Sequence, residues 1–117
     1  MEQQDFDKLI LTVLQGDDYD EVVDTLNQNG FFVTTLYSTG GFLKKRSVTA
    51  MIGVESSRLE EVLQILKTRA GSRMETVYQS LAVPHDGHPA PIPAIPMTKK
   101  VGGVTVFVMN LQRMEKY

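Results

Sequence analysis

The residues best suited to chemistry lie in one short segment, residues 38–47, which reads STGGFLKKRS. The segment combines hydroxyl groups, two adjacent glycines, a Phe-Leu pair and three consecutive positive charges. Glycines let a backbone approach a ligand and expose N–H groups to phosphate oxygens, while hydroxyls and cations complete an anion site. An adjacent aromatic ring can stack on a base. The segment therefore fits a nucleotide, but it also fits an ordinary connection with a solvated basic tip.

The rest of the sequence contains no familiar enzyme motif. It lacks a phosphate-binding loop with its lysine, a nucleophile elbow, a zinc-protease helix motif and a dinucleotide fingerprint. His85 and His88 lie on either side of Asp86, but a zinc site needs a third or fourth ligand that the scaffold fixes. Solvated histidines are the simpler interpretation. We expect no catalytic residue, no metal and no cofactor, and we expect that the protein is not an enzyme.

The composition limits the class of protein further. The chain has 117 residues, no cysteine and a formal net charge of −2 at pH 7. The length suits one domain, and the absence of cysteine excludes disulfides and fits a reducing cytoplasm. The acidic balance argues against a nucleic-acid polymer as partner. No apolar run reaches the ~20 residues of a membrane span, and the polar N-terminus does not resemble a secretory signal, so we expect a cytoplasmic protein.

Two strand-helix units of similar design are predicted to position these residues. An apolar run at residues 8–15 predicts a strand, and the capping-box spacing of Asp18 and Glu21 predicts that a helix begins there. An apolar stripe continues this helix until Asn29-Gly30, which favours a left-handed stop. The same order recurs in a second strand-helix unit, whose strand, capping box and stop are residues 48–54, Ser57 with Glu60, and Gly71.

Two further apolar runs, at residues 31–37 and 101–109, complete the order βαββαβ. Right-handed crossovers turn this order into a ferredoxin-like α+β sandwich, in which both helices cover one face of an antiparallel sheet. The runs 8–15 and 101–109 are apolar at nearly every residue, whereas a sheet face in water should alternate apolar and polar residues. Either another subunit or a folded-back loop must therefore cover the second face, and we expect an oligomer.

All five prolines lie between Arg73 and Lys100. A long connection of this composition within a small domain is usually functional. We predict a proline-rich loop at about 79–100 inside a single domain of residues 1–117. Both a lid over a ligand site and a stiff surface loop without a binding role fit this composition.

Three stretches carry a resemblance to a known family: TTLYSTGGFL at 34–43, IGV at 52–54 and VGGVTVFV at 101–108. In these residues, and over almost its whole length, the sequence resembles the PII-like cyclic-di-AMP receptors of Gram-positive bacteria. Members of that family are ferredoxin-like homotrimers that bind cyclic-di-AMP in clefts between subunits. The resemblance implies a trimeric, PII-like signal transduction protein. Its loops would rearrange on ligand binding and relay the signal to an unknown downstream protein.

The resemblance also implies a ligand site. Thr34 and Gly41 would meet phosphate or ribose. Phe42 and Leu43 would pack on adenine, with Gly53 against the base. The implied ligand-binding residues, of which the last would help to wall the cleft, are Thr34, Thr39, Gly40, Gly41, Phe42, Leu43, Ser47, Gly53 and Phe107.

Three residues, at two places in the chain, depart from the family pattern. Phe32 stands where the family usually has an arginine directed at the phosphate, and Arg46-Ser47 stands where it has Gly-Asn, whose asparagine reads the adenine edge. Losing a charged hydrogen bond costs ~1.5 to 3 kcal/mol, or roughly ten- to more than a hundredfold in affinity. Lys44, Lys45 and Arg46 are candidates for compensating phosphate contacts. The alternative function is a diverged PII-like trimer that no longer binds cyclic-di-AMP, and that acts as a protein-interaction module or binds another nucleotide.

Overall fold

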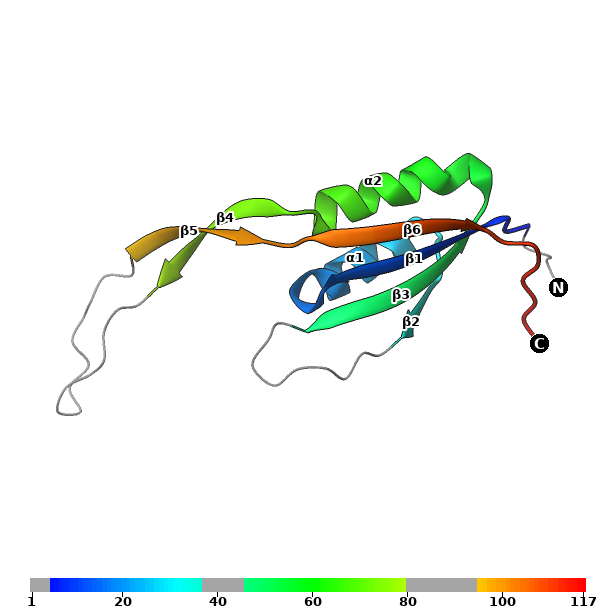
Figure 1. Ribbon diagram of the computed structural model, residues 1–117, viewed down its shortest axis with the longest axis horizontal. Coiled ribbons are helices and arrows are strands. Elements are labelled where there is room, and N and C mark those ends of the chain that lie inside the picture. Colours follow the sequence, from blue (N-terminus) through cyan, green and yellow to red (C-terminus); the bar gives the residue numbers. More distant parts are fainter. Residues whose placement is uncertain (1–4, 37–45, 80–94) are drawn as a thin grey trace. The chain divides into compact units, whose positions relative to one another are not determined.

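The structure is a computed structural model in which residues 5–36, 46–79 and 95–117 are described (Figure 1). The chain divides into two compact units. The larger unit comprises Met1–Gly71 together with Gly102–Tyr117, and the smaller unit comprises Ser72–Val101. The single domain predicted for residues 1–117 stays a prediction.

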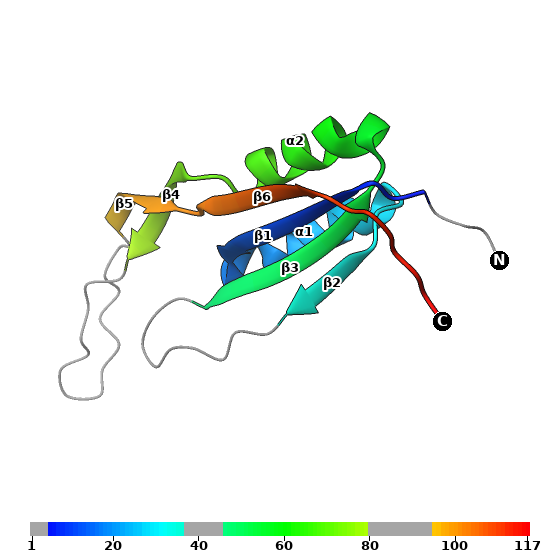
Figure 2. The same ribbon diagram turned by 45° about the vertical axis from the view of Figure 1, so that its right-hand side comes forward.

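A four-stranded antiparallel sheet and two helices form the larger unit. The strand order in the sheet is β2-β3-β1-β6. Both helices contact β1 and each other, and they lie on the same side of the sheet (Figures 1 and 2). Along the chain, the elements are β1 (Lys8–Gln15), α1 (Gly16–Gln28), β2 (Val33–Leu36), β3 (Ser47–Val54), the short 3-10 helix η1 (Ser56–Arg58), α2 (Leu59–Ala70) and β6 (Val104–Asn110). This is an α+β arrangement with the predicted βαββαβ order.

The core lies between the sheet and the helices. Alternate residues of β1 and β3 are buried, as expected for strands that have one face on a core. They meet the apolar stripes of α1 and α2. Among the described strand residues, Thr12 is the one buried polar side chain, and its hydroxyl donates to the carbonyl of Thr105 at 3.0 Å. The buried apolar residues of the described chain are Ile10, Leu14, Val22, Leu26, Phe31, Val48, Ala50, Ile52, Val54, Val62, Leu66 and Ala70.

The predicted start of α1 at Asp18 is wrong. The helix begins at Gly16 with Gln15 as its N-cap, and no side chain caps it. The reason is a tertiary contact, because the Gly16 N–H donates to the carbonyl of Arg46 at 2.6 Å. This bond satisfies one of the four N–H donors that the start of a helix leaves without an intrahelical partner. Asp18 lies inside the first turn and is buried.

The predicted start of α2 at Ser57 is also wrong, whereas both predicted stops are confirmed. Residues Ser56–Arg58 form η1, and α2 follows without a side-chain cap. A carboxylate from another part of the chain, that of Asp7, accepts hydrogen bonds from the N–H and the hydroxyl of Ser56. At the other helix ends, Gly30 has the left-handed φ of 85°, whereas α2 ends at Ala70 and the following Gly71 is extended, with a φ of −66°, so that only the position of this second stop was predicted.

The smaller unit is a two-stranded antiparallel ribbon of β4 (Arg73–Gln79) and β5 (Ile95–Val101). The predicted loop at 79–100 is therefore corrected at its C-terminal end, and residues 80–94 lie outside the described chain. Pro96 is compatible with β5, because each strand of a two-stranded ribbon has an unpaired edge where a missing N–H costs no ladder bond. The last strand was predicted to begin at 101, but Gly102 and Gly103 interrupt it with φ values of 78° and 118°.

Candidate functional site

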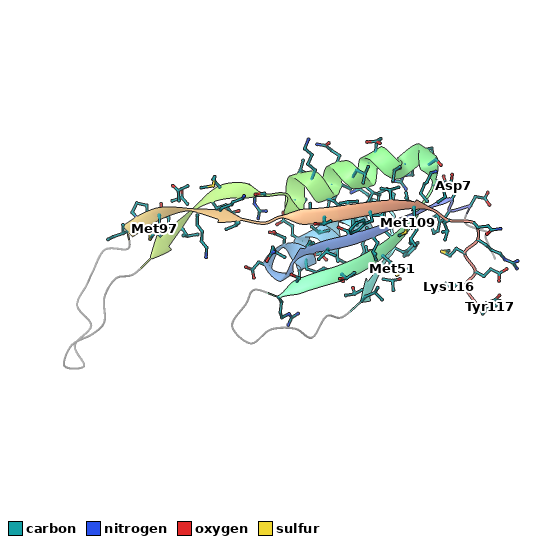
Figure 3. All side chains as sticks on the ribbon, viewed as in Figure 1. Asp7, Met51, Met97, Met109, Lys116 and Tyr117 are labelled. Carbon is teal, nitrogen blue, oxygen red and sulfur yellow. The ribbon has the colours of Figure 1, made fainter. Side chains whose placement is uncertain are left out.

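The sheet face opposite the helices is largely apolar, and no helix of the described residues covers it. Its side chains come from alternate positions of four strands, which the register arranges in rows across the sheet. Figure 3 labels Met51 on β3 and Met109 on β6, which belong to this open face. The middle row consists of Thr34, Met51, Leu11 and Phe107, and the next row contains Gly53, Leu9 and Met109.

The exposure of these side chains is high for apolar residues. Phe107 is 52% exposed, Met109 is 41% exposed and Leu36, at the end of β2, is 42% exposed. Contiguous apolar surface of this kind usually marks an interaction site. The structure thus agrees with the predicted need for a cover over the second face.

Four residues of the ligand set lie on this sheet. Thr34 is exposed in the middle of β2, and Ser47 is the first residue of β3. Gly53 lies near the other end of β3, and Phe107 lies in the middle of β6. Thr34 and Phe107 share a row but are separated by three strand spacings, or about 14 Å.

The remaining members of the predicted ligand set lie outside the described residues and stay predictions. They are Thr39, Gly40, Gly41, Phe42 and Leu43, together with the compensating candidates Lys44 and Lys45. The two histidines, His85 and His88, also lie outside the described residues.

Arg46 and Ser47 mark the point where the chain enters β3. The Arg46 side chain is exposed, whereas its backbone carbonyl is held by the Gly16 N–H. A Cβ at position 16 would lie 3.0 Å from that carbonyl oxygen, so the two segments approach closely. Ser47 pairs with Gln15 in the register of β1 and β3. The backbone at Arg46 is therefore fixed by the start of α1, while its charged group faces solvent.

Phe32 lies just before β2 and is 65% exposed. Val33 is opposite Ile52, so extending the register by one residue brings Phe32 opposite Gly53. A phenyl ring carries no charge and donates no hydrogen bond, so this position offers a ligand apolar contact instead of a charged phosphate contact.

A residue that the sequence analysis did not single out, Phe6, contacts Gly53. A Cβ built on Gly53 would lie 2.9 Å from the Phe6 Cδ2 atom and 3.5 Å from two further ring atoms. Gly53 alternates with the buried Ile52 and Val54, so this Cβ direction is that of the open face. The phenyl ring of Phe6 therefore lies on the open face, beside one of the predicted ligand residues. No periodicity or motif in the polar stretch before β1 indicates this contact.

Asp7 fixes the backbone next to Phe6 through hydrogen bonds to three other residues. Its N–H donates to the carbonyl of Val54 at 3.3 Å, and its carbonyl accepts from the N–H of Leu111 at 2.9 Å. Its carboxylate accepts the Ser56 hydroxyl and, at 2.7 Å, the Ser56 N–H. The hydrogen bonds from the Ser56 hydroxyl and backbone, more than the nearby charge of Lys8, lower the pKa of Asp7 below its usual value.

Neither a metal centre nor a membrane span emerges from the described residues. Within ranges 5–36, 46–79 and 95–117, no three histidine, aspartate or glutamate side chains are grouped so as to hold a metal ion. None of the helices in these ranges is long and apolar enough to cross a membrane.

The larger unit is thus an α+β sandwich of βαββαβ order with one largely apolar sheet face that no helix of the described residues covers. A family model described as cyclic-di-AMP receptor matches residues 7–117, and the chain belongs to this family of receptors. The predicted family is confirmed. A similar solved structure is the crystal structure of a functionally unknown protein from Pediococcus pentosaceus, which is 30% identical. The match covers 96% of this chain and 98% of that chain, with a TM-score of 0.73.

Proposed function

We propose that the protein is a cytoplasmic, trimeric receptor that binds cyclic-di-AMP at its subunit interfaces and signals to a downstream protein through loop rearrangement. The observation that carries this proposal is the family match over residues 7–117, which includes every predicted ligand residue. Nucleotide binding without turnover is consistent with the absence of an enzyme motif from the sequence.

The open face supports assembly of several copies. It presents apolar side chains from all four strands, and Phe107 and Met109 are among the most exposed of them. A second and a third copy of the chain would remove this surface from water, which is the main favourable term in most protein association. Three copies arranged around one axis form a closed assembly, so the interface does not propagate into a filament.

The spacing of the ligand residues supports a site shared between subunits. Within one chain, Thr34 and Phe107 lie on opposite edge strands about 14 Å apart, with the side chains of Met51 and Leu11 between them. A single base cannot contact both edge strands of the same sheet. If a neighbouring subunit supplies Phe107, the two residues can face the same ligand.

The chemistry of the described residues suits the parts of this ligand. The exposed hydroxyl of Thr34 can donate to a phosphate oxygen or accept from ribose. The half-exposed ring of Phe107 offers an apolar wall to a purine, and stacking of a base on an aromatic ring contributes about 1–3 kcal/mol. The exposed guanidinium of Arg46 is a cation at the entry to β3 that can approach a phosphate.

Isothermal calorimetry tests the proposal directly. The purified protein is titrated with cyclic-di-AMP, with ATP and cyclic-di-GMP as control ligands. We expect saturable binding of one ligand per subunit, and Phe107→Ala and Phe42→Ala should each weaken it by about five- to a hundredfold. Tyr117→Ala is the matched control, because this aromatic side chain is fully exposed and lies outside the ligand set. No heat with cyclic-di-AMP from folded protein would refute the proposal.

A second candidate function follows from Phe32. This ring is 65% exposed at the position where the family usually places its phosphate-binding arginine. The second candidate is a trimer that has lost cyclic-di-AMP and acts as a protein-interaction module or binds another nucleotide. Phe32→Arg distinguishes the two candidates in the same titration. Binding that appears only in this variant favours the diverged trimer, whereas binding by the unchanged protein favours the receptor.

A further inference from the structure

We propose that Phe6 is a further residue of the ligand site, and that its ring occupies the base position beside Gly53 and competes with the incoming ligand. The inference rests on the proposed function. It assigns a role to Phe6, which lies just before the residues that the family model matches.

The conformation of Gly53 shows why the ring matters. Among the described glycines, the positive φ angles belong to Gly30, Gly102 and Gly103, so the backbone at Gly53 does not itself demand glycine. A larger residue at position 53 would meet the Phe6 ring, because its Cβ would lie 2.9 Å from the Phe6 Cδ2 atom. At this distance one of the two groups must move. The missing side chain of Gly53 therefore makes room for a flat group on the open face, and the ring of Phe6 takes this room.

The ring is held in place through the neighbouring residue. Asp7 is bonded to Val54 and Leu111 through its backbone and to Ser56 through its carboxylate. Val54 is the next residue after Gly53, so the anchor lies directly beside the contact that it supports. We assign Asp7 as a positioning residue, which acts on the site through Phe6 and does not itself touch the ligand.

A base that packs against Gly53 must first displace the ring. The apparent dissociation constant then equals the intrinsic constant divided by the fraction of protein whose base position is open. Phe6 is half-buried. The free energy of partly burying a phenyl ring corresponds to a base position that is open in about one third to one tenth of the molecules. Removing the ring should raise the affinity by the same factor.

The first experiment is calorimetry with cyclic-di-AMP on the unchanged protein, Phe6→Ala, Asp7→Asn and the control Tyr117→Ala. We expect Phe6→Ala to bind about three- to tenfold more tightly, Asp7→Asn to bind more tightly by a smaller factor, and the control to be unchanged. Unchanged affinity in Phe6→Ala overturns the proposal while the receptor function stands. Weaker binding also overturns it, because the ring would then be a stacking platform for the base and not a competitor.

The second experiment needs no ligand and separates the failure of this inference from the failure of the proposed function. The chain contains no tryptophan, so Phe6→Trp introduces a single indole fluorophore. We expect its emission to shift to longer wavelength when Gly53→Ala is added, because the new methyl group pushes the indole into water. An unchanged spectrum shows that the ring does not occupy Gly53 and overturns the proposal.

Cyclic-di-AMP is then added to the Phe6→Trp protein. Displacement of the indole into water predicts the same shift to longer wavelength. Quenching of the indole emission without a shift in wavelength would indicate that the indole stacks on the base, and it would overturn the proposed competition. If no variant binds cyclic-di-AMP in either experiment, the proposed function fails and the competition fails with it, even where the Gly53→Ala shift confirms the contact.

Discussion

Replacing Leu11 by glutamate tests whether the open face is the interface of the proposed trimer. Leu11 lies at the centre of this face, between Met51 on β3 and Phe107 on β6. Its side chain points away from the helices and is half-buried in the single chain, so glutamate can reach water there without entering the core. Gln64→Glu is the matched control, because it adds the same charge at an exposed position of α2.

The size of the effect follows from two contributions. A half-buried leucine that becomes fully buried on assembly contributes about 1 kcal/mol, which glutamate loses. Desolvating an unpaired carboxylate in an interface costs about 3 kcal/mol more. Three copies together lose about 12 kcal/mol. The midpoint concentration of a monomer–trimer equilibrium varies as the square root of its dissociation constant, so the midpoint should rise by about four orders of magnitude.

Size-exclusion chromatography with multi-angle light scattering at micromolar concentration measures this change. We expect the unchanged protein and Gln64→Glu to have three times the subunit mass of 13.1 kDa, and Leu11→Glu to have the subunit mass alone. Far-ultraviolet circular dichroism should show that all three proteins keep the same secondary structure. A trimer that survives in Leu11→Glu would show that the open face is not the interface. A monomeric unchanged protein would refute the trimer itself.

Three further substitutions test the fold and Asp7. Leu66→Ala, at a fully buried position, should lower the free energy of unfolding in urea by about 2–5 kcal/mol, whereas Gln64→Ala should change it by less than about 0.5 kcal/mol. Gly103→Ala should cost about 1–3 kcal/mol, because φ is 118° and no nearby atom offers a compensating contact; an unchanged urea midpoint would contradict this. The lowered pKa of Asp7 means that its stabilisation is present above about pH 4 and is lost as pH falls through the folded-state pKa. Asp7→Asn should therefore flatten the acid limb of the stability–pH profile, and an unaltered limb would exclude this role.

The parts of the fold that the sequence predicted well depend on local patterns. The run at 8–15 coincides with β1, and Gly30 ends α1 with a left-handed φ, because a strand next to a core and a helix stop both leave short-range signals. The helix starts were predicted wrongly because their donors are satisfied from far along the chain. Gly16 bonds to Arg46, and Ser56 bonds to Asp7, so spacing within each helix could not indicate either partner.

Residues of the candidate site could be proposed from the sequence only where they lie in short stretches that resemble the family. Thr34, Gly53 and Phe107 were predicted through resemblance, and the register places them on one face of one sheet. The contact of Phe6 with Gly53 joins a residue just before β1 to a residue near the end of β3. It depends on the alignment of β1 with β3 and on the Asp7 anchor, neither of which composition or periodicity fixes. The β5 strand was missed because its proline argued for a loop.

If the protein assembles and binds cyclic-di-AMP as proposed, the two processes use one surface and are therefore coupled. Thr34, Gly53 and Phe107 lie on the same sheet face as Leu11, which lies outside the predicted ligand set. A ligand that takes contacts from two subunits binds the assembled protein and not the monomer, so it must also stabilise the assembly. Leu11→Glu should therefore weaken cyclic-di-AMP binding without touching the ligand, and the loss should diminish as protein concentration rises. Phe42→Ala, which removes a predicted contact with adenine, should lose affinity at every concentration, and this difference separates the role of the interface from the role of the site.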